Sequence, residues 1–473
     1  MTTKLALLAG LLALLSASPL RAIELPPLNP QDPSLDGAAA ENALDYKAPL
    51  DTAEPVAPVP DAAPAATALI PAESLWKRIR AGFAMPEVES PLVARHEAWY
   101  LNRPDYVQRI VERSRLYLYF IVEEVEKRKM PMEVALLPMI ESAYNPTAYS
   151  RAHASGIWQF IPSTGKRYGL QQNWWYDGRR DVVTATRAAL DYLDGLHDQF
   201  GDWQLALAAY NWGENGVARA IAKNKARRKP TNYMSLKMPR ETRNYLPKLQ
   251  AVKNIISHPD KLGFPLDDIP NSPYFTTVTT PQHIDMQVAA RLADMTEDDF
   301  RSLNPAHNRP VITSNGSRTL LVPIEKAALF QANLKGYDAP LVSWQTYTLK
   351  KNETLATVAA KFEIGQDRLR EINGISRHTP VKPGRSLLVP MDEDEDASNF
   401  GDTWNTPEFQ PPEDRYGGRV SYKVRSGDSL YSIARKHRVT VAAIKDWNKL
   451  RSNQIRAGQR LTIYTSTRQT ALR

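Results

Sequence analysis

Residues 130–142 read MPMEVALLPMIES, an apolar run that ends on an acidic and a hydroxyl side chain. Pro131 suits the first turn of a helix, so the run predicts a helix buried in a core. Glu141 then ends the apolar stretch LLPMI, which would remove water from its carboxyl and raise its pKa. Such a glutamate can act as a general acid near neutral pH, although a solvated glutamate at a helix end is commoner.

Apolar periodicity around this run predicts an all-α domain over residues 73–265. In PDYVQRIVERSRLYLYFIVEEVEKRKM (104–130), apolar residues recur at steps of three and four, which predicts one long amphipathic helix. Asp181 and Asp202 each precede a further helical stretch and are suited to cap its first turn. Several such helices would pack around the run at 130–142.

The C-terminal part of the chain repeats itself. TYTLKKNETLATVAAKFEIGQDRLREINGI (346–375) aligns without a gap on SYKVRSGDSLYSIARKHRVTVAAIKDWNKL (421–450), which brings Asn373 onto Asn448. Each copy reads strand, helix, helix and closing strand. The repeat therefore predicts small α+β modules of βααβ order, with bounds 344–390 and 420–465.

A fainter third copy precedes these two, over about 272–335. RSLNP (301–305) and SRTLLVP (317–323) echo the ends of the clear copies. This copy lacks the loop after its first strand, so we expect it to be a degenerate module with a structural role. The two clear copies are separated by an acidic Pro/Gly-rich linker at 391–419, and residues 466–473 form a tail.

The N-terminus has the layout of a secretory signal peptide over residues 1–22. Lys4 precedes 11 apolar residues, and small residues follow up to a cleavage point expected after Ala22. A bilayer requires about 20 apolar residues, so no integral membrane span is expected. Residues 23–72 form a Pro/Ala-rich leader that we expect to be disordered. The mature protein is therefore predicted to be exported.

Composition excludes several kinds of chemistry. The 473 residues contain no cysteine, which excludes disulfides, thiolate metal sites and cysteine nucleophiles. Neither a phosphate-binding loop nor a metal-ligand cluster is recognisable, so we expect no metal and no cofactor. With 60 Lys and Arg against 52 Asp and Glu, the net charge of +8 allows an anionic polymer as partner but does not identify one.

Five motifs follow one another in the helical region: ALLPMIESAYNP (135–146), ASGIWQFIPSTGKRYGL (154–170), WWYDGRRD (174–181), ALAAYNWGENGV (206–217) and ETRNYLPKL (241–249). In order and spacing they resemble the lytic murein transglycosylases of the goose-lysozyme-like superfamily, specifically the membrane-bound type D subfamily. The repeats resemble LysM modules, which bind the N-acetylglucosamine-containing backbones of peptidoglycan and chitin. The resemblance implies a multidomain chain, with an all-α lysozyme-like catalytic (SLT) domain followed by small α+β LysM modules.

This resemblance implies a reaction and a role for Glu141. Peptidoglycan would be cleaved at the β-1,4 bond between N-acetylmuramic acid and N-acetylglucosamine, leaving 1,6-anhydromuramic acid ends. Glu141 would protonate the leaving oxygen, the substrate's acetamido oxygen would stabilise the cation, and Glu141 would then deprotonate the C6 hydroxyl. The motifs contain no second carboxylate where a nucleophile or base would be expected, because a cap or a turn explains Asp177 and Asp181.

Other site residues follow from the family one by one. Ser142 is expected to hydrogen-bond near the acid or the substrate, Gln159 to contact the sugar, and Tyr245 to orient Glu141. Tyr210 and Asn211 are expected to support the acetamido group. Packing or helix capping is the alternative explanation for these positions.

Further residues are assigned to saccharide binding or left open. In the LysM modules the resemblance implies a shallow groove between the loop after the first strand and the loop before the last. Its residues in the second clear copy would be Gly427, Asp428, Ser429, Leu430 and Ile455. In the first clear copy they would be Thr354 and Leu355, and Asn352 there replaces a glycine, which makes binding less certain. The aromatics at 174–176 are either a sugar-stacking wall or ordinary packing.

Partners and location follow from the same reading. Peptidoglycan glycan strands are the expected partner, and nucleic acid is not, because the basic run KNKARRK (223–229) has no recognition motif beside it. That run is explained by a solvated helix end or by contact with anionic wall peptides. The subfamily is tethered by a lipidated cysteine, so a chain without cysteine is expected in the periplasm, held at the cell wall by its LysM modules. Two alternatives stay open: a hydrolytic muramidase of the same fold, and a non-catalytic peptidoglycan-binding scaffold.

Overall fold

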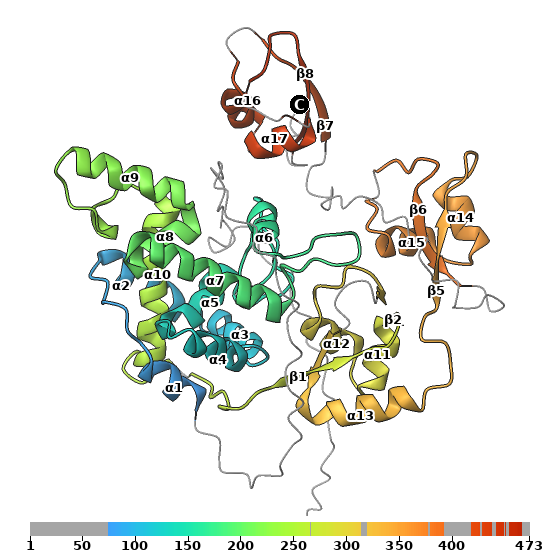
Figure 1. The fold of residues 1–473 in the computed structure, drawn as a ribbon, viewed down its shortest axis with the longest axis horizontal. Helices are drawn as coiled ribbons and strands as arrows, with labels where there is room; N and C mark the ends of the chain where they lie inside the picture. The colour runs from blue at the N-terminus through green and yellow to red at the C-terminus, as the bar shows by residue number, and fades with distance from the viewer. Residues whose placement is uncertain are drawn as a thin grey trace, which may run out of the picture.

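Figure 1 shows the computed structural model, which describes residues 74–264, 266–313, 319–376, 379–391, 418–425, 428–437, 441–448, 450 and 454–465. The predicted signal peptide, leader and tail lie outside the described residues, as do Gly427 and almost all of the acidic linker. Helices fill the N-terminal part of the described chain and small two-stranded sheets appear only beyond it, which confirms the predicted multidomain fold class.

The N-terminal domain is helical. Its elements are α1 (Leu75–Ala81), α2 (Pro91–Leu101), α3 (Pro104–Ser114), α4 (Leu118–Lys127), the 3-10 helix η2 (Met132–Leu136), α5 (Leu137–Glu141), α6 (Pro162–Arg167), α7 (Val182–Phe200), α8 (Trp203–Trp212), α9 (Glu214–Ala226), the 3-10 helix η3 (Tyr233–Ser235) and α10 (Arg240–Ser257). The carboxylates of Asp181 and Asp202 cap α7 and α8, as predicted, by accepting hydrogen bonds of 2.8 and 2.9 Å from the backbone N–H groups of Thr184 and Leu205.

The long helix predicted over 104–130 is wrong, because a turn at 115–117 separates α3 from α4. The Ser114 hydroxyl donates a 2.7 Å hydrogen bond back to the carbonyl of Val111. The Tyr117 hydroxyl donates to the carbonyl of Ser302, far along the chain, at 2.5 Å. These two contacts, one local and one tertiary, end the helix despite the helical periodicity. Neither contact can be inferred from the spacing of apolar residues.

The run at 130–142 is also not one helix, because η2 and α5 divide it. Pro138 has no N–H with which to continue a helix from η2, and it lies instead in the first turn of α5, where that group is not needed. Glu141 is the last residue of α5, so the prediction that it ends an apolar helical stretch is confirmed.

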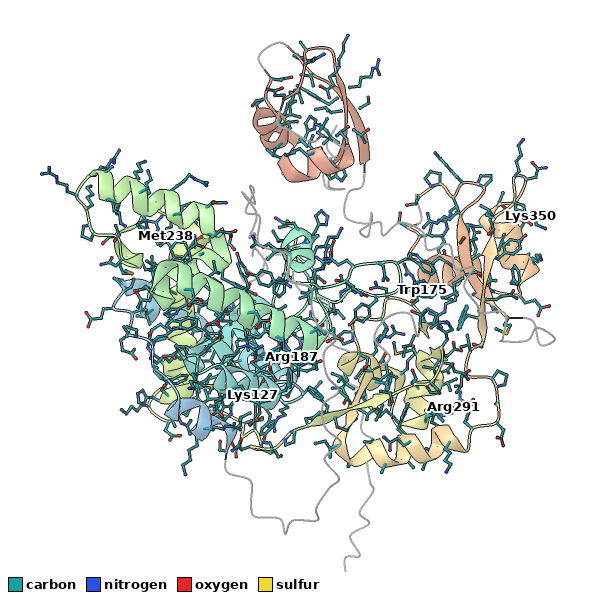
Figure 2. The ribbon with its side chains drawn as sticks, in the orientation of Figure 1. Lys127, Trp175, Arg187, Met238, Arg291 and Lys350 are labelled. Atoms are coloured by element: carbon teal, nitrogen blue, oxygen red, sulfur yellow. The ribbon has the colours of Figure 1, made fainter. Side chains whose placement is uncertain are left out.

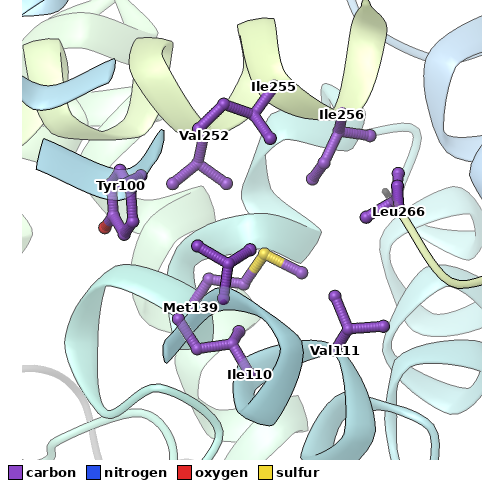
Figure 3. Close-up of a pocket in the computed structure, with 9 residues that line it drawn as sticks. Tyr100, Ile110, Val111, Met139, Val252, Ile255, Ile256 and Leu266 are labelled. Atoms are coloured by element: carbon purple, nitrogen blue, oxygen red, sulfur yellow. The ribbon is translucent and has the colours of Figure 1, made fainter. Parts of the chain in front are cut away.

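One apolar core fills the helical domain and packs α3, α5 and α10 together. These helices meet around a cavity of about 20 Å³, into which Met139 of α5 points (Figure 3). The volume is close to that of one water molecule, and the walls offer a water no polar partner. The cavity is therefore a small packing defect behind α5 rather than a binding site.

Three βααβ modules follow, of which the two clear copies have the predicted order of elements. The first has β1 (Phe275–Thr279), α11 (Met286–Leu292), α12 (Glu297–Leu303) and β4 (Thr319–Pro323), together with β2 (Ile284–Asp285), β3 (Val311–Ile312) and α13 (Ile324–Lys335). The second has β5 (Trp344–Thr348), α14 (Leu355–Lys361), α15 (Gln366–Ile372) and β6 (Ser386–Pro390). The third has β7 (Gly418–Lys423), α16 (Leu430–His437), α17 (Val441–Trp447) and β8 (Arg460–Thr465). The first and last strands of each module pair antiparallel.

An asparagine after the second helix makes the same two hydrogen bonds in every module. The carboxamide of Asn373, just after α15, donates to the carbonyl of Leu388 in the last strand at 2.8 Å and accepts from its N–H at 2.6 Å. The same pair of bonds joins Asn304 to Leu321 and Asn448 to Thr462. Because the second helix is fastened to the last strand identically three times, the faint first copy has the architecture of the two clear ones.

The segment at 174–181 connects the helical domain to the first two modules. Trp174, Trp175 and Tyr176 are buried in an apolar cluster with Ala306, Val311, Val342, Ile372 and Leu388. Two backbone hydrogen bonds cross the same junction, from the Asp177 N–H to the carbonyl of Ala306 and from the Asn308 N–H to that of Trp175. Figure 2 labels Trp175 at this place. The three aromatics are therefore packing residues of a domain junction.

Candidate active site

Glu141 stands where the chain leaves α5 and reverses direction. The next residues Ala143 and Tyr144 both have left-handed backbone angles, with φ of 52° and 53°. The buried Tyr144 fixes this reversal, because its hydroxyl donates a 2.9 Å hydrogen bond to the carbonyl of Ala135. Consecutive left-handed residues other than glycine are costly and are characteristic of functional sites. The turn leaves Glu141 half-buried.

Burial raises the pKa of Glu141 to about 7. A hydrogen bond of 2.5 Å from the Tyr245 hydroxyl to Oε1 opposes this effect, because it stabilises the charged carboxylate. The positive charge of Lys248 also lowers the pKa, whereas the negative charge of Glu241 raises it. Desolvation dominates, and Glu141 is therefore a carboxyl that can both give and take a proton near neutral pH.

Two residues of this set, Glu241 and Lys248, were missed by the sequence analysis. They lie on α10 four residues before and three residues after Tyr245, so all three occupy one face of the helix. Lys248 also holds the end of α5, because its Nζ donates to the carbonyl of Ile140 at 2.9 Å. The i, i+4, i+7 spacing in ETRNYLPKL was the available signal. Through α10, Glu241 is thus a second carboxylate whose charge acts on Glu141.

Tyr210 and Asn211 end α8 beside this group. The Tyr210 hydroxyl donates a 2.8 Å hydrogen bond to the carbonyl of Trp158, and the charge of Glu141 adds to the burial that raises the pKa of Tyr210. Asn211 accepts a 2.8 Å hydrogen bond from the Thr242 hydroxyl and donates through Nδ2 to Glu241 at 3.4 Å. The two side chains therefore connect α8 to the loop around Trp158 and to the start of α10.

Ser142 and Gln159 belong to the two segments that frame Glu141. The Ser142 hydroxyl donates to the carbonyl of Ile157 at 2.9 Å and so ties the end of α5 to the loop at 153–160. Gln159 has a left-handed φ of 50°, and its Nε2 donates to the carbonyl of Gly156 at 2.8 Å. A Cβ on Gly156 would lie 1.9 Å from the carbonyl oxygen of Arg179, so only glycine fits this close approach.

A buried ion pair holds the 153–160 loop from behind. Arg179 is fully buried and pairs with Asp177 through Nε at 2.8 Å and Nη2 at 2.7 Å. Its Nη1 donates to the carbonyls of His153 and Phe160, which lie on either side of Gln159. Asp177 is the residue whose backbone bonds to Ala306 in the first module. The domain junction and the loop that carries Gln159 therefore share one pair of charges.

The LysM residues make contacts within their own modules. The carboxylate of Asp428 accepts from the Tyr422 hydroxyl at 2.9 Å and from the backbone N–H of Arg425 at 2.7 Å. Thr354 caps α14 in a capping box with Thr357, and Ser429 makes the equivalent bonds with Ser432. Leu355 and Leu430 are buried, whereas Ile455 is partly exposed.

Within the described ranges no group of three or more His, Cys, Asp or Glu residues could hold a metal ion. No helix in that part of the chain has the length and apolar character needed to cross a membrane.

Family models match most of the helical domain and all three modules. The Transglycosylase SLT domain family matches residues 118–232, and the LysM domain family matches 347–390 and 422–463. The LysM-like domain of lytic transglycosylase MltD matches 274–339, which is the faint first module.

Individual relatives agree with the family matches. The chain is 34% identical over 412 residues to membrane-bound lytic murein transglycosylase D of Escherichia coli K12, covering 84% of this chain and 87% of that protein. A protein of Alteromonas sp. (strain M-1) named for tributyltin chloride resistance is 46% identical over 162 residues, which are 34% of this chain and 76% of that protein. The extent of the first match and the shared domain order show that the chain belongs to the lytic murein transglycosylase D family.

Proposed function

We propose that this protein cleaves peptidoglycan as a lytic transglycosylase, with Glu141 as the only group that transfers protons. The main support is the pKa of Glu141, which is raised to about 7. This carboxyl ends an apolar helix and lies 2.5 Å from the Tyr245 hydroxyl. A carboxyl with this pKa is populated in both protonation states at neutral pH. The two steps of the reaction need those two states in turn.

In the first step the protonated Glu141 gives its proton to the glycosidic oxygen between N-acetylmuramic acid and N-acetylglucosamine. The C1–O bond breaks, and the acetamido oxygen of the same muramic residue bonds to C1, which gives an oxazolinium ion. In the second step the Glu141 carboxylate removes the proton of the C6 hydroxyl while O6 displaces the acetamido oxygen. The product is a 1,6-anhydro ring, no water is consumed, and Glu141 is protonated again.

The surrounding residues position this chemistry. The Tyr245 hydroxyl orients the carboxyl, and Ser142 fixes the end of α5 against the loop at 153–160. We assign the sugar contact to Gln159, because Ser142 ties its loop to the end of α5. We assign support of the acetamido group to Tyr210 and Asn211, because the charge of Glu141 acts on Tyr210.

The modules bring the enzyme to its polymer. We propose weak saccharide sites at the loops that carry Thr354 and Leu355 in one LysM module and Gly427, Asp428, Ser429 and Leu430, with Ile455 opposite, in the other. Two weak sites on one chain gain avidity through effective concentration. We further propose that residues 1–22 are a signal peptide and that the protein acts in the periplasm at the wall. Residues 73–265, 344–390 and 420–465 are then the catalytic domain and the two binding modules.

Glu241 supports a second candidate, a hydrolytic muramidase. A carboxylate close enough to raise the pKa of Glu141 could activate a water molecule. Asn211 and the charge balance with Lys248 instead favour a tuning role for Glu241, so we rank hydrolysis second.

One digest distinguishes these functions. Purified sacculi are incubated with the full chain, and the soluble products are resolved by mass spectrometry. A transglycosylase yields anhydro ends that are lighter by one water, whereas a muramidase yields reducing ends. Glu141→Gln should release nothing. Release of reducing ends alone, or unchanged lysis by Glu141→Gln, would contradict the proposal.

A further inference from the structure

The positive charge of the chain is concentrated in one short stretch. Residues 223–243 contain eight basic side chains and one acidic one, a net charge of +7, against +8 for the whole chain. We call the eight the basic patch: Lys223, Lys225, Arg227, Arg228, Lys229, Lys237, Arg240 and Arg243. It runs from the last turn of α9, through η3, to the first turn of α10.

These charges are not neutralised within the described part of the chain. All eight residues are exposed, and none of their side chains has an ion pair or hydrogen bond there. Elsewhere in the same domain several cations are paired, as Arg78 is with Glu123 and Glu126, and Lys253 with Glu133, whereas others, such as Lys129 and Lys261, are exposed and unpaired but single. Eight like charges held close together repel one another, so the patch gains most from an anionic partner.

The patch is held by a rigid framework. Asn224 is buried, and its Nδ2 donates to the carbonyls of Pro230 at 2.7 Å and Ser235 at 3.0 Å, which fastens the end of α9 to η3. The buried Tyr233 donates its hydroxyl to the carbonyl of Thr242 and accepts from the N–H of Leu246, which fastens η3 to α10. The charges therefore sit on a preorganised surface, and less entropy is lost when a ligand binds.

The patch adjoins the candidate active site. Arg240 and Arg243 lie within five residues of Tyr245 on α10, which is about 7 Å along a helix at 1.5 Å per residue. Figure 1 shows α9 at the edge of the helical domain, and both α9 and α10 contact α8. A polymer that passes Glu141 can therefore reach Arg240 and Arg243, the end of the patch on α10, with its next substituents.

We infer that the basic patch binds the carboxylates of the peptides attached to the glycan strand. The inference rests on the proposed function, because it gives the substrate of that site a second, anionic point of contact. Each muramic residue of uncleaved peptidoglycan carries a short peptide with free carboxylates, and the sugars themselves are largely neutral. The active site would select peptide-bearing strands over stripped ones by this contact.

The test compares binding of full-length proteins that all carry Glu141→Gln, so that the polymer is not consumed. K223Q/K225Q/R228Q removes three patch charges from exposed positions, and K129Q/K261Q/K335Q removes three exposed, unpaired charges outside the patch. Each protein is cosedimented with intact sacculi and with sacculi whose peptides were removed by an amidase. Circular dichroism and thermal melting check that the variants are folded.

We expect the patch variant to bind intact sacculi about tenfold more weakly than the control at 50 mM NaCl. The two should bind stripped sacculi equally, and the difference should shrink at 0.5 M NaCl, where charges are screened. Equal binding by patch and control variants, or equal loss on stripped sacculi, would overturn the inference.

A different partner is tested in parallel. If the patch binds a membrane instead, vesicles of phosphatidylethanolamine and phosphatidylglycerol at 7:3 would bind the parent protein but not the patch variant. That result would overturn the inference if the patch variant also bound sacculi as tightly as the control. A failure of the proposed function would be seen in a different measurement, the lysis of sacculi. In that case Glu141→Gln would still lyse sacculi, while the binding difference between the two variants would remain measurable.

Discussion

The Tyr245 hydroxyl donates a 2.5 Å hydrogen bond to Oε1 of Glu141, although 104 positions separate the two residues. The bond joins the end of α5 to the second turn of α10, and its acceptor is a carboxyl whose pKa burial has raised to about 7. Glu241 and Lys248 lie on the same face of α10 and act on that pKa in opposite directions. One helix therefore supplies the electrostatic control of the acid.

Substitutions on this face of α10 should shift the pH profile of cleavage in opposite directions, depending on whether the residue raises or lowers the pKa of Glu141. The free enzyme must hold Glu141 protonated, so kcat/KM should fall as pH rises above about 7. Glu241→Gln removes a charge that raises the pKa and should shift this limb to lower pH. Tyr245→Phe and Lys248→Met remove groups that stabilise the carboxylate and should shift it to higher pH.

Initial rates of product release from soluble glycan strands, measured from pH 5 to 9, check these shifts. Lys335→Met, at the exposed end of α13, serves as a matched control that should leave the limb in place. A shift of the same sign in Glu241→Gln and Lys248→Met would contradict the electrostatic account.

Glu141→Gln should abolish cleavage and stabilise the protein at neutral and alkaline pH. The pKa of Glu141 is raised on folding from about 4.5 to about 7, so wild type loses stability relative to the variant as pH rises across that window. The full difference is up to about 3 kcal/mol above pH 7, at 1.36 kcal/mol per pKa unit. Urea unfolding at pH 4 and pH 8 measures it. An equal difference at both pH values would mean that the carboxyl is not desolvated.

Breaking the buried Asp177–Arg179 pair should destabilise the catalytic domain by about 3–5 kcal/mol, because either single change leaves a charge buried alone. Arg179→Met should also lower cleavage beyond its effect on folding, since the loop that carries Gln159 loses two backbone supports.

Arg301→Gln is the control for the pair. It breaks a surface pair with Glu297 and should cost less than about 1 kcal/mol. Urea denaturation and kcat are measured for each variant. If Arg179→Met loses no more stability and no more kcat than the control, Arg179 does not support the loop that carries Gln159.

The module asparagines should each protect one amide of the last strand. Asn373→Ala leaves the N–H and carbonyl of Leu388 without partners and should destabilise its module by about 2–4 kcal/mol. Hydrogen exchange at the Leu388 amide should quicken at least tenfold, whereas Gln366→Ala on the exposed start of α15 should leave it unchanged. Unaltered exchange in Asn373→Ala would show that the strand is held by other contacts.

Local sequence patterns predicted much of this architecture. The caps at Asp181 and Asp202, the end of α5 at Glu141 and the βααβ repeats follow from residues close together in the chain. The single helix over 104–130 failed because Tyr117 bonds to Ser302, a partner that periodicity does not contain. The aromatics at 174–176 stayed open for the same reason, since their neighbours come from two later modules.

The sequence by itself determined the class of each domain, the order of the domains and the glutamate that we propose as the acid, because short-range patterning and ordered motifs encode these. Tertiary structure alone decided the pKa of that acid, the approach of Glu241 and Lys248, and the brace from Arg179 to the Gln159 loop. These properties depend on desolvation and on distances of a few ångströms between segments far apart in the chain. Such distances exist only once α5, α8 and α10 have packed together.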